Sequence, residues 1–195
     1  MTQPSDKFYE ARITVRKEFA ADLWMVRVAP AGPFSFTAGQ YATLAVERNG
    51  KRAEKAYSIV SSPYEPELEF FIELVPGGEL TPLLYELHEG QTLLMRKAIK
   101  GRFTLDLKSG RRRHLMLATV TGIAPYVSYV RTLYRDWKQD KMPAPVELYI
   151  LQGGSRSWEF GYREELERYA AEVPWLKYVP SVSRPWEDPA WKGET

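Results

Sequence analysis

A Thr-Gly turn follows an expected apolar strand and precedes an expected helix, within the segment LATVTGIAPY from Leu117 to Tyr126. Backbone N–H groups in such a turn, together with the positive end of the following helix, attract anions such as a pyrophosphate. Pro125 suits the first helical turn, where its missing N–H costs nothing. The segment lacks the glycine spacing of a dinucleotide fingerprint or a P-loop. Taken alone, it is equally compatible with a tight turn that only starts a helix.

The absence of some residue types, and the isolation of others, excludes several kinds of chemistry. The chain of 195 residues has no cysteine, which excludes disulfides, thiolate metal sites, cysteine nucleophiles and cysteine-ligated iron–sulfur clusters within it. No metal site is expected. No acid–base dyad is evident either, because His88 is expected in a short helix and His114 lies beside arginines. Any redox chemistry would therefore use a bound organic cofactor.

Charge and hydropathy exclude two classes of partner. A net charge of +2 is too small to indicate nucleic-acid binding, and the cluster Arg111–His114 is interpreted as a solvated strand entry or an inter-domain edge. No apolar run reaches membrane-spanning length, and the start MTQPSDKFYE lacks the pattern of a signal peptide. The expectation is a protein of the cytoplasm that binds neither nucleic acid nor membrane.

The first half of the chain has the two-residue period of strands. Apolar residues alternate in three segments, namely Trp24, Val26 and Val28, then Ala42, Leu44 and Val46, then Leu68, Phe70, Ile72 and Leu74. In the third segment Glu69 and Glu73 fall on the opposite, polar face, where Phe71 is the exception. Turn residues separate these segments. One short helix is expected at 80–87. The pattern favours an antiparallel sandwich or small barrel.

The second half alternates between strands and helices. HLMLAT (114–119) is apolar enough to lie inside a parallel sheet, and VELYIL (146–151) and LKYVPSV (176–182) follow as strands. Two apolar stripes predict the intervening helices, the first at Ile123, Val127, Val130, Leu133 and Trp137 and the second at Tyr162, Leu166, Tyr169 and Val173. The opposite face of the first helix carries Ser128, Arg131, Arg135 and Lys138. A βαβαβ unit places ligand-binding turns at the carboxyl ends of its strands, where the Thr-Gly turn lies.

Four stretches resemble the ferredoxin–NADP reductase family in the same order. They are FTAGQY (36–41), KAYSIVSSP (55–63), GGELTPLL (77–84) and TGIAP (121–125). The resemblance covers essentially the whole chain. It implies two domains, an antiparallel Greek-key β-barrel that binds FAD at residues 1–108 and an α/β parallel-sheet domain that binds NADP at 109–195.

The resemblance assigns FAD contacts to the first half. Tyr57 would lie against the flavin ring, and Ser58 would place its hydroxyl near the atom that accepts hydride, which makes these two the catalytic candidates. Lys55 replaces the family's usual arginine, so it would keep the charge at the phosphates and lose the bidentate fork. The Thr81 hydroxyl would meet the pyrophosphate, cap the short helix, or do both. The other cofactor-binding positions are Ala56, Ile72, Glu73, Leu74, Glu79 and Leu80.

The resemblance assigns nucleotide contacts to the second half. Thr121 and Gly122 would lie at the junction between flavin and nicotinamide, after Val120 where the family commonly has glycine. Valine disfavours a positive φ, so the turn is expected to differ in shape or in dinucleotide affinity. Contacts to the adenosine end fall at Ser155, Arg156, Ser183 and Arg184. A hydroxyl and a guanidinium suit the 2′-phosphate of NADP, although nearby Glu187 and Asp188 leave NAD open.

The function implied by the resemblance is electron transfer between NADP(H) and ferredoxin or flavodoxin through FAD. Two alternatives stay open: an NADH-linked reductase component of an oxygenase or multi-subunit dehydrogenase, and a flavin-binding module without turnover. The oligomeric state stays open too. The final segment SRPWEDPAWKGET stops where the family continues with further strands and helices, so the sequence is expected to be truncated. A three-strand remnant would leave an exposed apolar surface or a free sheet edge.

Overall fold

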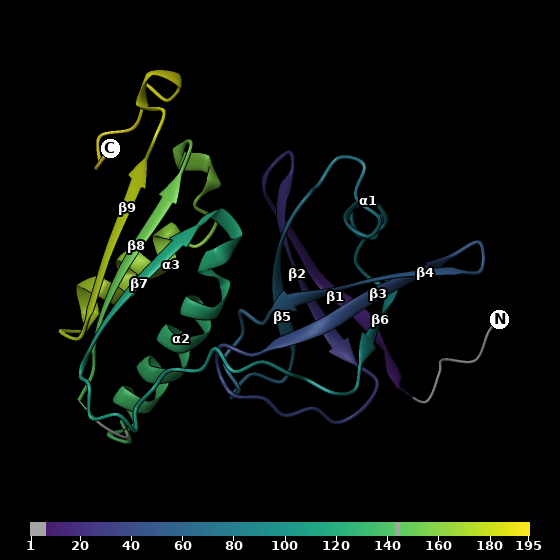
Figure 1. Ribbon diagram of the computed structural model, residues 1–195, viewed down its shortest axis with the longest axis horizontal. Helices are drawn as coiled ribbons and strands as arrows, with labels where there is room; N and C mark the ends of the chain where they lie inside the picture. Colours follow the sequence, from purple (N-terminus) through teal and green to yellow (C-terminus); the bar gives the residue numbers. More distant parts are fainter. Residues whose placement is uncertain (1–6, 143–144) are drawn as a thin grey trace.

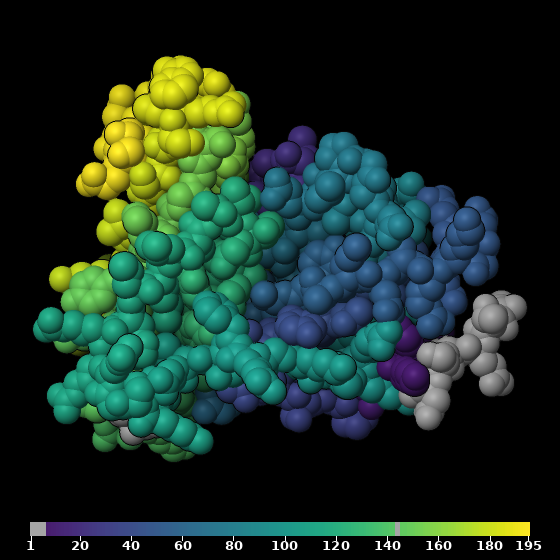
Figure 2. Space-filling view, in the orientation of Figure 1, coloured from purple at the N-terminus to yellow at the C-terminus, as the bar shows by residue number. Residues whose placement is uncertain are grey.

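The computed structural model describes residues 7–142 and 145–195. It has two parts, a curled antiparallel sheet formed by the first half of the chain and a smaller parallel sheet formed by the second half, with helix α2 between them (Figure 1). The two-part architecture expected from the change of period is confirmed. In the space-filling view the parts pack against each other and separate at a notch beside the barrel's upper edge (Figure 2).

The first part is an antiparallel barrel. Within residues 7–112 its sheet has the strand order β4-β3-β6-β1-β2-β5. The strands are β1 (Phe8–Ala20), β2 (Leu23–Pro30), β3 (Tyr41–Arg48), β4 (Lys51–Ser58), β5 (Leu68–Glu73) and β6 (Thr92–Arg96). An antiparallel bridge between Ile59 and Phe70 joins the end of β4 to β5 and closes the sheet on itself. The short helix α1 (Thr81–Tyr85) follows β5.

The barrel core consists of the alternating residues expected from the sequence. Trp24 and Val28 on β2 and Phe70 and Ile72 on β5 are fully buried, and Trp24 lies directly opposite Ile72 in the antiparallel register. Leu80 and Leu84 bury one side of α1 against the same core. This inward face supplies the hydrophobic stabilisation of the barrel.

The outward face of β5 differs from the expectation of a polar, solvated surface. Glu69 is 0% exposed and Phe71 only 3% exposed. Both are covered because the second part of the chain packs on this face: Phe71 belongs to the core cluster that contains Ile123, Val127 and Tyr162. The alternation in sequence identified the two faces of β5 correctly, but at Glu69 and Phe71 the outward face is covered by the second part and does not meet water.

The second part is a parallel sheet with helices. Within residues 113–142 and 145–195 the strand order is β7-β8-β9, with β7 (Arg113–Thr119), β8 (Glu147–Gly154) and β9 (Leu176–Val182). The helices are α2 (Ala124–Lys138) and α3 (Arg163–Glu172), and 3-10 turns occur at Val120–Ile123, Ser157–Glu159 and Pro185–Glu187. Pro125 stands in the first turn of α2, as expected. Both apolar helical stripes predicted from the sequence are confirmed.

Helix α2 is buried on two sides, which the sequence interpretation missed. Ser128 is 0% exposed, and its hydroxyl donates a hydrogen bond of 2.7 Å to the carbonyl of Ser61 in the barrel. The Arg131 side chain is 12% exposed. Arg135 and Lys138, further along the same face, are exposed as expected. The first two turns of the helix are therefore wedged between the sheet and the barrel, and only its last turns meet water on this face.

Strand β7 lies at the edge of its sheet, where the sequence favoured an interior position. It pairs with β8 on one side only among the described strands. One face of the sheet carries no described helix, so Leu115 is 72% exposed and Leu117 is 61% exposed. Their cross-strand neighbours Leu151 and Val179 are also exposed, and together these four residues form an uncovered apolar face. The expected exposed apolar surface is confirmed.

We expect this uncovered apolar face to promote self-association. Substituting Leu117→Lys should raise the protein concentration at which association begins by roughly tenfold, while the free energy of unfolding changes by less than about 0.5 kcal/mol because the site is at the surface. Light scattering over a concentration series measures the first quantity. Val15→Lys, at an isolated exposed apolar site on the barrel, is the control. Equal association of both variants would contradict the prediction.

Candidate functional site

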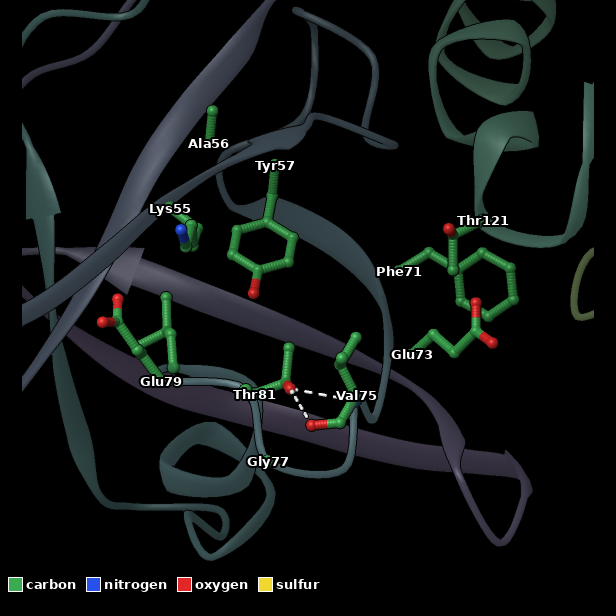
Figure 3. A pocket seen from close by; sticks show the side chains of 12 residues that line it. Lys55, Ala56, Tyr57, Phe71, Glu73, Val75, Gly77, Glu79, Thr81 and Thr121 are labelled. Atoms are coloured by element: carbon green, nitrogen blue, oxygen red, sulfur yellow. Dashed lines mark hydrogen bonds between the residues drawn. The ribbon is translucent and has the colours of Figure 1, made fainter.

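A pocket of about 650 Å³ lies between the barrel and the start of the second part. Its walls come from β4, β5, the loop before α1 and the turn after β7 (Figure 3). The lining residues are Lys55, Ala56, Tyr57, Phe71, Glu73, Val75, Gly77, Gly78, Glu79, Leu80, Thr81 and Thr121. Eight of them are among the positions expected to bind a cofactor. The barrel and the second part thus contribute to the same pocket.

Tyr57 is the central aromatic side chain of the pocket. Its ring lies in the middle of the view, with the hydroxyl directed toward Thr81 (Figure 3). Burial raises the pKa of Tyr57 to about 12, so the phenol stays protonated near neutral pH. Among the described residues its hydroxyl has no hydrogen-bond partner. Tyr57 therefore offers both an apolar ring and a free polar group to a ligand.

The loop before α1 is held by the Thr81 hydroxyl. This hydroxyl accepts a hydrogen bond from the Val75 N–H at 3.0 Å and lies 3.4 Å from the Val75 carbonyl oxygen. It does not cap α1, whose N-terminal cap residue is Leu80 without a side-chain hydrogen bond, so the capping alternative is wrong. A Cβ atom at Gly78 would lie 3.0 Å from the Val75 oxygen, so glycine allows the loop to close this tightly.

Basic and acidic side chains both line the pocket. Lys55 makes no ion pair with any side chain that the structure describes, so its ammonium group is available to an anion. On the other side, burial raises the pKa of Glu73, and the neighbouring carboxylates of Asp22 and Glu159 raise it further. A ligand with an anionic portion and an uncharged ring system matches this distribution, with the anion on the Lys55 side.

Thr121 faces Tyr57 from the opposite side of the pocket (Figure 3). It belongs to the 3-10 turn that joins β7 to α2, and this turn begins at Val120 with φ of 40°. A positive φ is costly for a β-branched residue, because its Cβ atom crowds the backbone. The structure therefore holds Val120 in the left-handed region, although valine disfavours that conformation.

The strain at Val120 gives a testable stability difference. Val120→Gly and Val120→Ala both lose the valine methyl groups, but only glycine relieves the positive φ. We expect the glycine variant to be more stable than the alanine variant by about 1 kcal/mol, as measured by urea denaturation. An alanine variant of equal or greater stability would show that the turn does not carry this strain.

Eight of the expected cofactor positions do not line the pocket, and four of these were expected to contact FAD or the nicotinamide. Ser58 is half-buried at the end of β4, and Gly122 is exposed in the turn. Ile72 is fully buried in the barrel core, and Leu74 packs against that core. Ile72 points inward because it alternates with the pocket residue Phe71 along β5. The roles of all four toward a cofactor stay predictions.

The positions expected to bind adenosine form a separate cluster. The turns after β8 and β9 are joined by backbone hydrogen bonds, from Arg184 N–H to Ser155 O at 3.0 Å and from Ser183 N–H to Gly154 O at 2.9 Å. The Arg156 guanidinium forms an ion pair with Glu187, and Arg184 lies 3.7 Å from the same carboxylate. Both arginines therefore already face an acidic side chain.

The sequence interpretation missed four pocket residues as ligand-contacting positions: Phe71, Val75, Gly77 and Gly78. Phe71 had a signal, because it was the one apolar residue on the otherwise acidic face of its strand. Gly77 and Gly78 belong to the stretch GGELTPLL (77–84), but the resemblance assigned no ligand contact to them. Val75 carried no signal of its own, since its position depends on the contact with Thr81.

Within residues 7–142 and 145–195, no helix combines the length and apolarity needed to span a membrane.

Two families of known domains match the chain, one on each side of its centre. The oxidoreductase FAD-binding domain matches residues 10–105, and the oxidoreductase NAD-binding domain matches residues 116–195. The pocket lies where these two matched regions meet, because Tyr57 falls in the first and Thr121 in the second.

Two sequence relatives and one solved structure are similar to the chain across both of these matched regions or part of them. The chain is 39% identical over 123 residues to a flavodoxin/ferredoxin–NADP reductase of Buchnera aphidicola, an alignment that covers 62% of this chain and 49% of that protein. It is 32% identical over 191 residues to ferredoxin–NADP reductase B of Sorangium cellulosum, covering 95% of this chain and 73% of that protein. A crystal structure of a ferredoxin NADP⁺ reductase from Neisseria gonorrhoeae with bound FAD and NADP has the same fold, with a TM-score of 0.77 at 24% identity, covering 92% of this chain and 70% of that one.

The first of these relatives is about twice as long as the segment that this chain covers. The alignment with the Sorangium protein, in contrast, covers more than two thirds of that protein's length. Domain matches, pocket position and relatives agree, and the chain belongs to the ferredoxin–NADP reductase family.

Proposed function

We propose that this chain binds FAD in the pocket between its two parts and transfers electrons between NADP(H) and ferredoxin or flavodoxin. The observation that carries the proposal is that Tyr57 of the barrel and Thr121 of the second part line one pocket. In this proposal the boundary between the FAD-binding and NADP-binding domains falls at residues 108 and 109. A cytoplasmic location is also part of the proposal, and cell fractionation tests it.

The residues present fit FAD. The pocket volume of about 650 Å³ lies within the range that holds cofactor-sized ligands. Tyr57 and Phe71 offer apolar ring surface for the flavin, and the unpaired Lys55 offers positive charge for the phosphates. The Gly77–Gly78 backbone leaves space close to the chain, and the Thr81 hydroxyl holds that loop in place.

Bound FAD would supply the chemistry, because it takes up two electrons as a hydride and releases them one at a time. The protein's own residues would bind, orient and shield it. Tyr57 and Ser58 would border the reactive edge of the ring, Thr121 and Gly122 would border the nicotinamide, and the half-buried Tyr57 ring would exclude water. Ala56, Glu73, Glu79 and Leu80 would complete the lining of the proposed FAD site, and Ile72 and Leu74, whose side chains pack in the barrel, would contribute to it only through their backbone.

The electron partner is proposed from the family. Ferredoxins and flavodoxins are acidic, and the net charge of +2 on this chain favours their approach. The expected consequence is that electron transfer to either partner slows as the salt concentration rises.

One observation favours an NADH-linked reductase component as the second candidate. Arg156 and Arg184, the proposed contacts for the 2′-phosphate of NADP, both face Glu187. A carboxylate at this place would repel the phosphate and tolerate the free hydroxyl of NAD. The ratio of reduction rates with NADPH and NADH, measured on the same preparation, decides between the two candidates.

The proposed function is tested by purifying the protein under native conditions and recording its absorbance before and after anaerobic addition of NADPH. We expect a flavin spectrum that bleaches on addition. A colourless protein that FAD cannot reconstitute would overturn both enzyme functions. A yellow protein that neither NADPH nor NADH bleaches would instead be a flavin-binding module without turnover.

A further inference from the structure

Glu69 is a fully buried carboxylate with three partners. Its Oε2 accepts a hydrogen bond of 2.8 Å from Arg27 Nε, and its Oε1 accepts 3.1 Å and 2.8 Å bonds from Arg131 Nη2 and the Tyr162 hydroxyl. The side chain is 0% exposed. Burial raises the pKa of Glu69, but Arg131, Arg27 and Tyr162 outweigh it and hold the pKa below its ordinary value. Glu69 is therefore an ionised group held in place on both oxygens.

These partners come from different elements. Arg27 lies on β2, beside Glu69 of β5 in the barrel, while Arg131 lies on α2 and Tyr162 immediately precedes α3. Arg131 also binds Glu165 of α3 through two hydrogen bonds of 2.7 Å and 2.9 Å. We call Glu69, Arg131 and Tyr162 the interface clamp. It joins the barrel to both helices of the second part.

The interface clamp contacts a wall of the pocket. Phe71 lies two residues after Glu69 on the same face of β5, and its ring centroid is 5.1 Å from that of Tyr162 in an edge-on arrangement. Phe71 lines the pocket. The fit is close, because a Cβ atom at Gly161 would lie 2.6 Å from the Phe71 ring. A displacement of Tyr162 would therefore change the packing against Phe71.

The opposite wall depends on the same clamp. Thr121 belongs to the turn that continues directly into α2, and Arg131 ties α2 to β5 through Glu69. One buried carboxylate thus helps to hold the barrel wall of the pocket and the Thr121 wall at a set separation, together with the hydrogen bond from Ser128 to Ser61. Reacting groups held by two domains lose rate steeply when their separation changes, because productive geometry tolerates little displacement.

We propose that Glu69 is a positioning residue for the reaction in the pocket, and that it acts through Tyr162 and Arg131 to set the placement of Phe71 and Thr121. This inference rests on the proposed function for its effect on turnover. Its effect on the pocket walls does not depend on that function.

The test compares Glu69→Gln with Glu172→Gln. Both replace a carboxylate that binds a tyrosine hydroxyl and an arginine, but Glu172 joins Tyr134 and Arg168 at the exposed side of α2 and α3, without touching the barrel. Tyr162→Phe, which removes one hydroxyl and keeps the ring, serves if Glu69→Gln fails to fold. Its control is Tyr134→Phe.

Two measurements are made on each variant. The first is hydrogen–deuterium exchange of the flavin-free protein over residues 119–131, where we expect Glu69→Gln to raise exchange rates by about tenfold. The second is steady-state reduction of ferricyanide by NADPH in the FAD-loaded protein. Here we expect kcat to fall by about tenfold or more while KM and flavin content stay within about twofold.

The outcomes separate the inference from the proposed function. Unchanged exchange and unchanged kcat in Glu69→Gln and Tyr162→Phe would overturn the inference, as would equal effects of the matched control variants. A loss of kcat that is matched by loss of flavin would also overturn it, because that pattern indicates binding and not positioning. If the parent protein is not reduced by NADPH, the proposed function fails, and the exchange measurement alone decides whether Glu69 holds the pocket walls.

Discussion

Glu69→Ala is expected to lower the free energy of unfolding by about 3–5 kcal/mol, because it leaves the buried charge of Arg131 without one of its carboxylate partners. The loss should exceed that of an exposed pair, where water replaces the missing partner. Urea denaturation near neutral pH measures the change. Glu172→Gln, at an exposed cluster on the same two helices, should be much less destabilising.

The same carboxylate predicts how stability depends on pH. The pKa of Glu69 is lowered in the folded protein relative to its ordinary value of 4.5. Its contribution is therefore fully present above about 4.5 and is lost as pH falls through the lower folded value. Glu69→Gln cannot titrate at this position. The stability difference between the parent and Glu69→Gln should thus shrink as pH falls below about 4.5, and a constant difference would contradict the assignment of a lowered pKa.

Tyr57→Ala is expected to weaken FAD binding roughly 30-fold, which corresponds to about 2 kcal/mol for removing a ring that covers the cofactor. Tyr57→Phe keeps the ring and should bind FAD within about threefold of the parent. Fluorescence titration of the flavin-free protein with FAD measures both. Because burial raises the pKa of Tyr57 to about 12, affinity should not change through ionisation of this phenol near neutral pH.

Tyr149→Ala is the matched control for Tyr57→Ala in the FAD titration. Tyr149 lies on β8 and does not line the pocket, so its removal should leave FAD affinity unchanged. If Tyr57→Ala binds FAD as tightly as the parent, or if Tyr149→Ala loses as much affinity, the pocket around Tyr57 is not the FAD site.

Several features of this protein could be predicted because they depend on local sequence. Alternation of apolar residues identified β2, β3 and β5, and the three-to-four-residue spacing identified α2 and α3, since each period matches the geometry of its element. The turn at Thr121 was located in the same way, between a strand and a helix with Pro125 in its first turn. The four sequence stretches that resemble the ferredoxin–NADP reductase family, and that follow one another in the same order as in that family, indicated the family without knowledge of the pocket.

Other features depend on which elements pack together, and periodicity carries no information about that. Glu69, Ser128 and Arg131 are polar residues on the faces opposite the apolar stripes of their elements. They are buried because the barrel and the second part cover those faces, and each has partners from a distant segment. Conversely, Leu115 and Leu117 are as apolar as core residues, yet they are exposed because no described element covers their face.

The sequence by itself determined the elements, their order and the residue types available for chemistry, since backbone geometry and hydrophobic periodicity are local properties. Only the tertiary structure decided that Tyr57 and Thr121 share one pocket, that Ser58 stands outside its lining, and that Glu187 faces the two arginines. The reason is physical: contacts between segments far apart in the chain arise from packing two faces together, and many packings are compatible with the same local pattern.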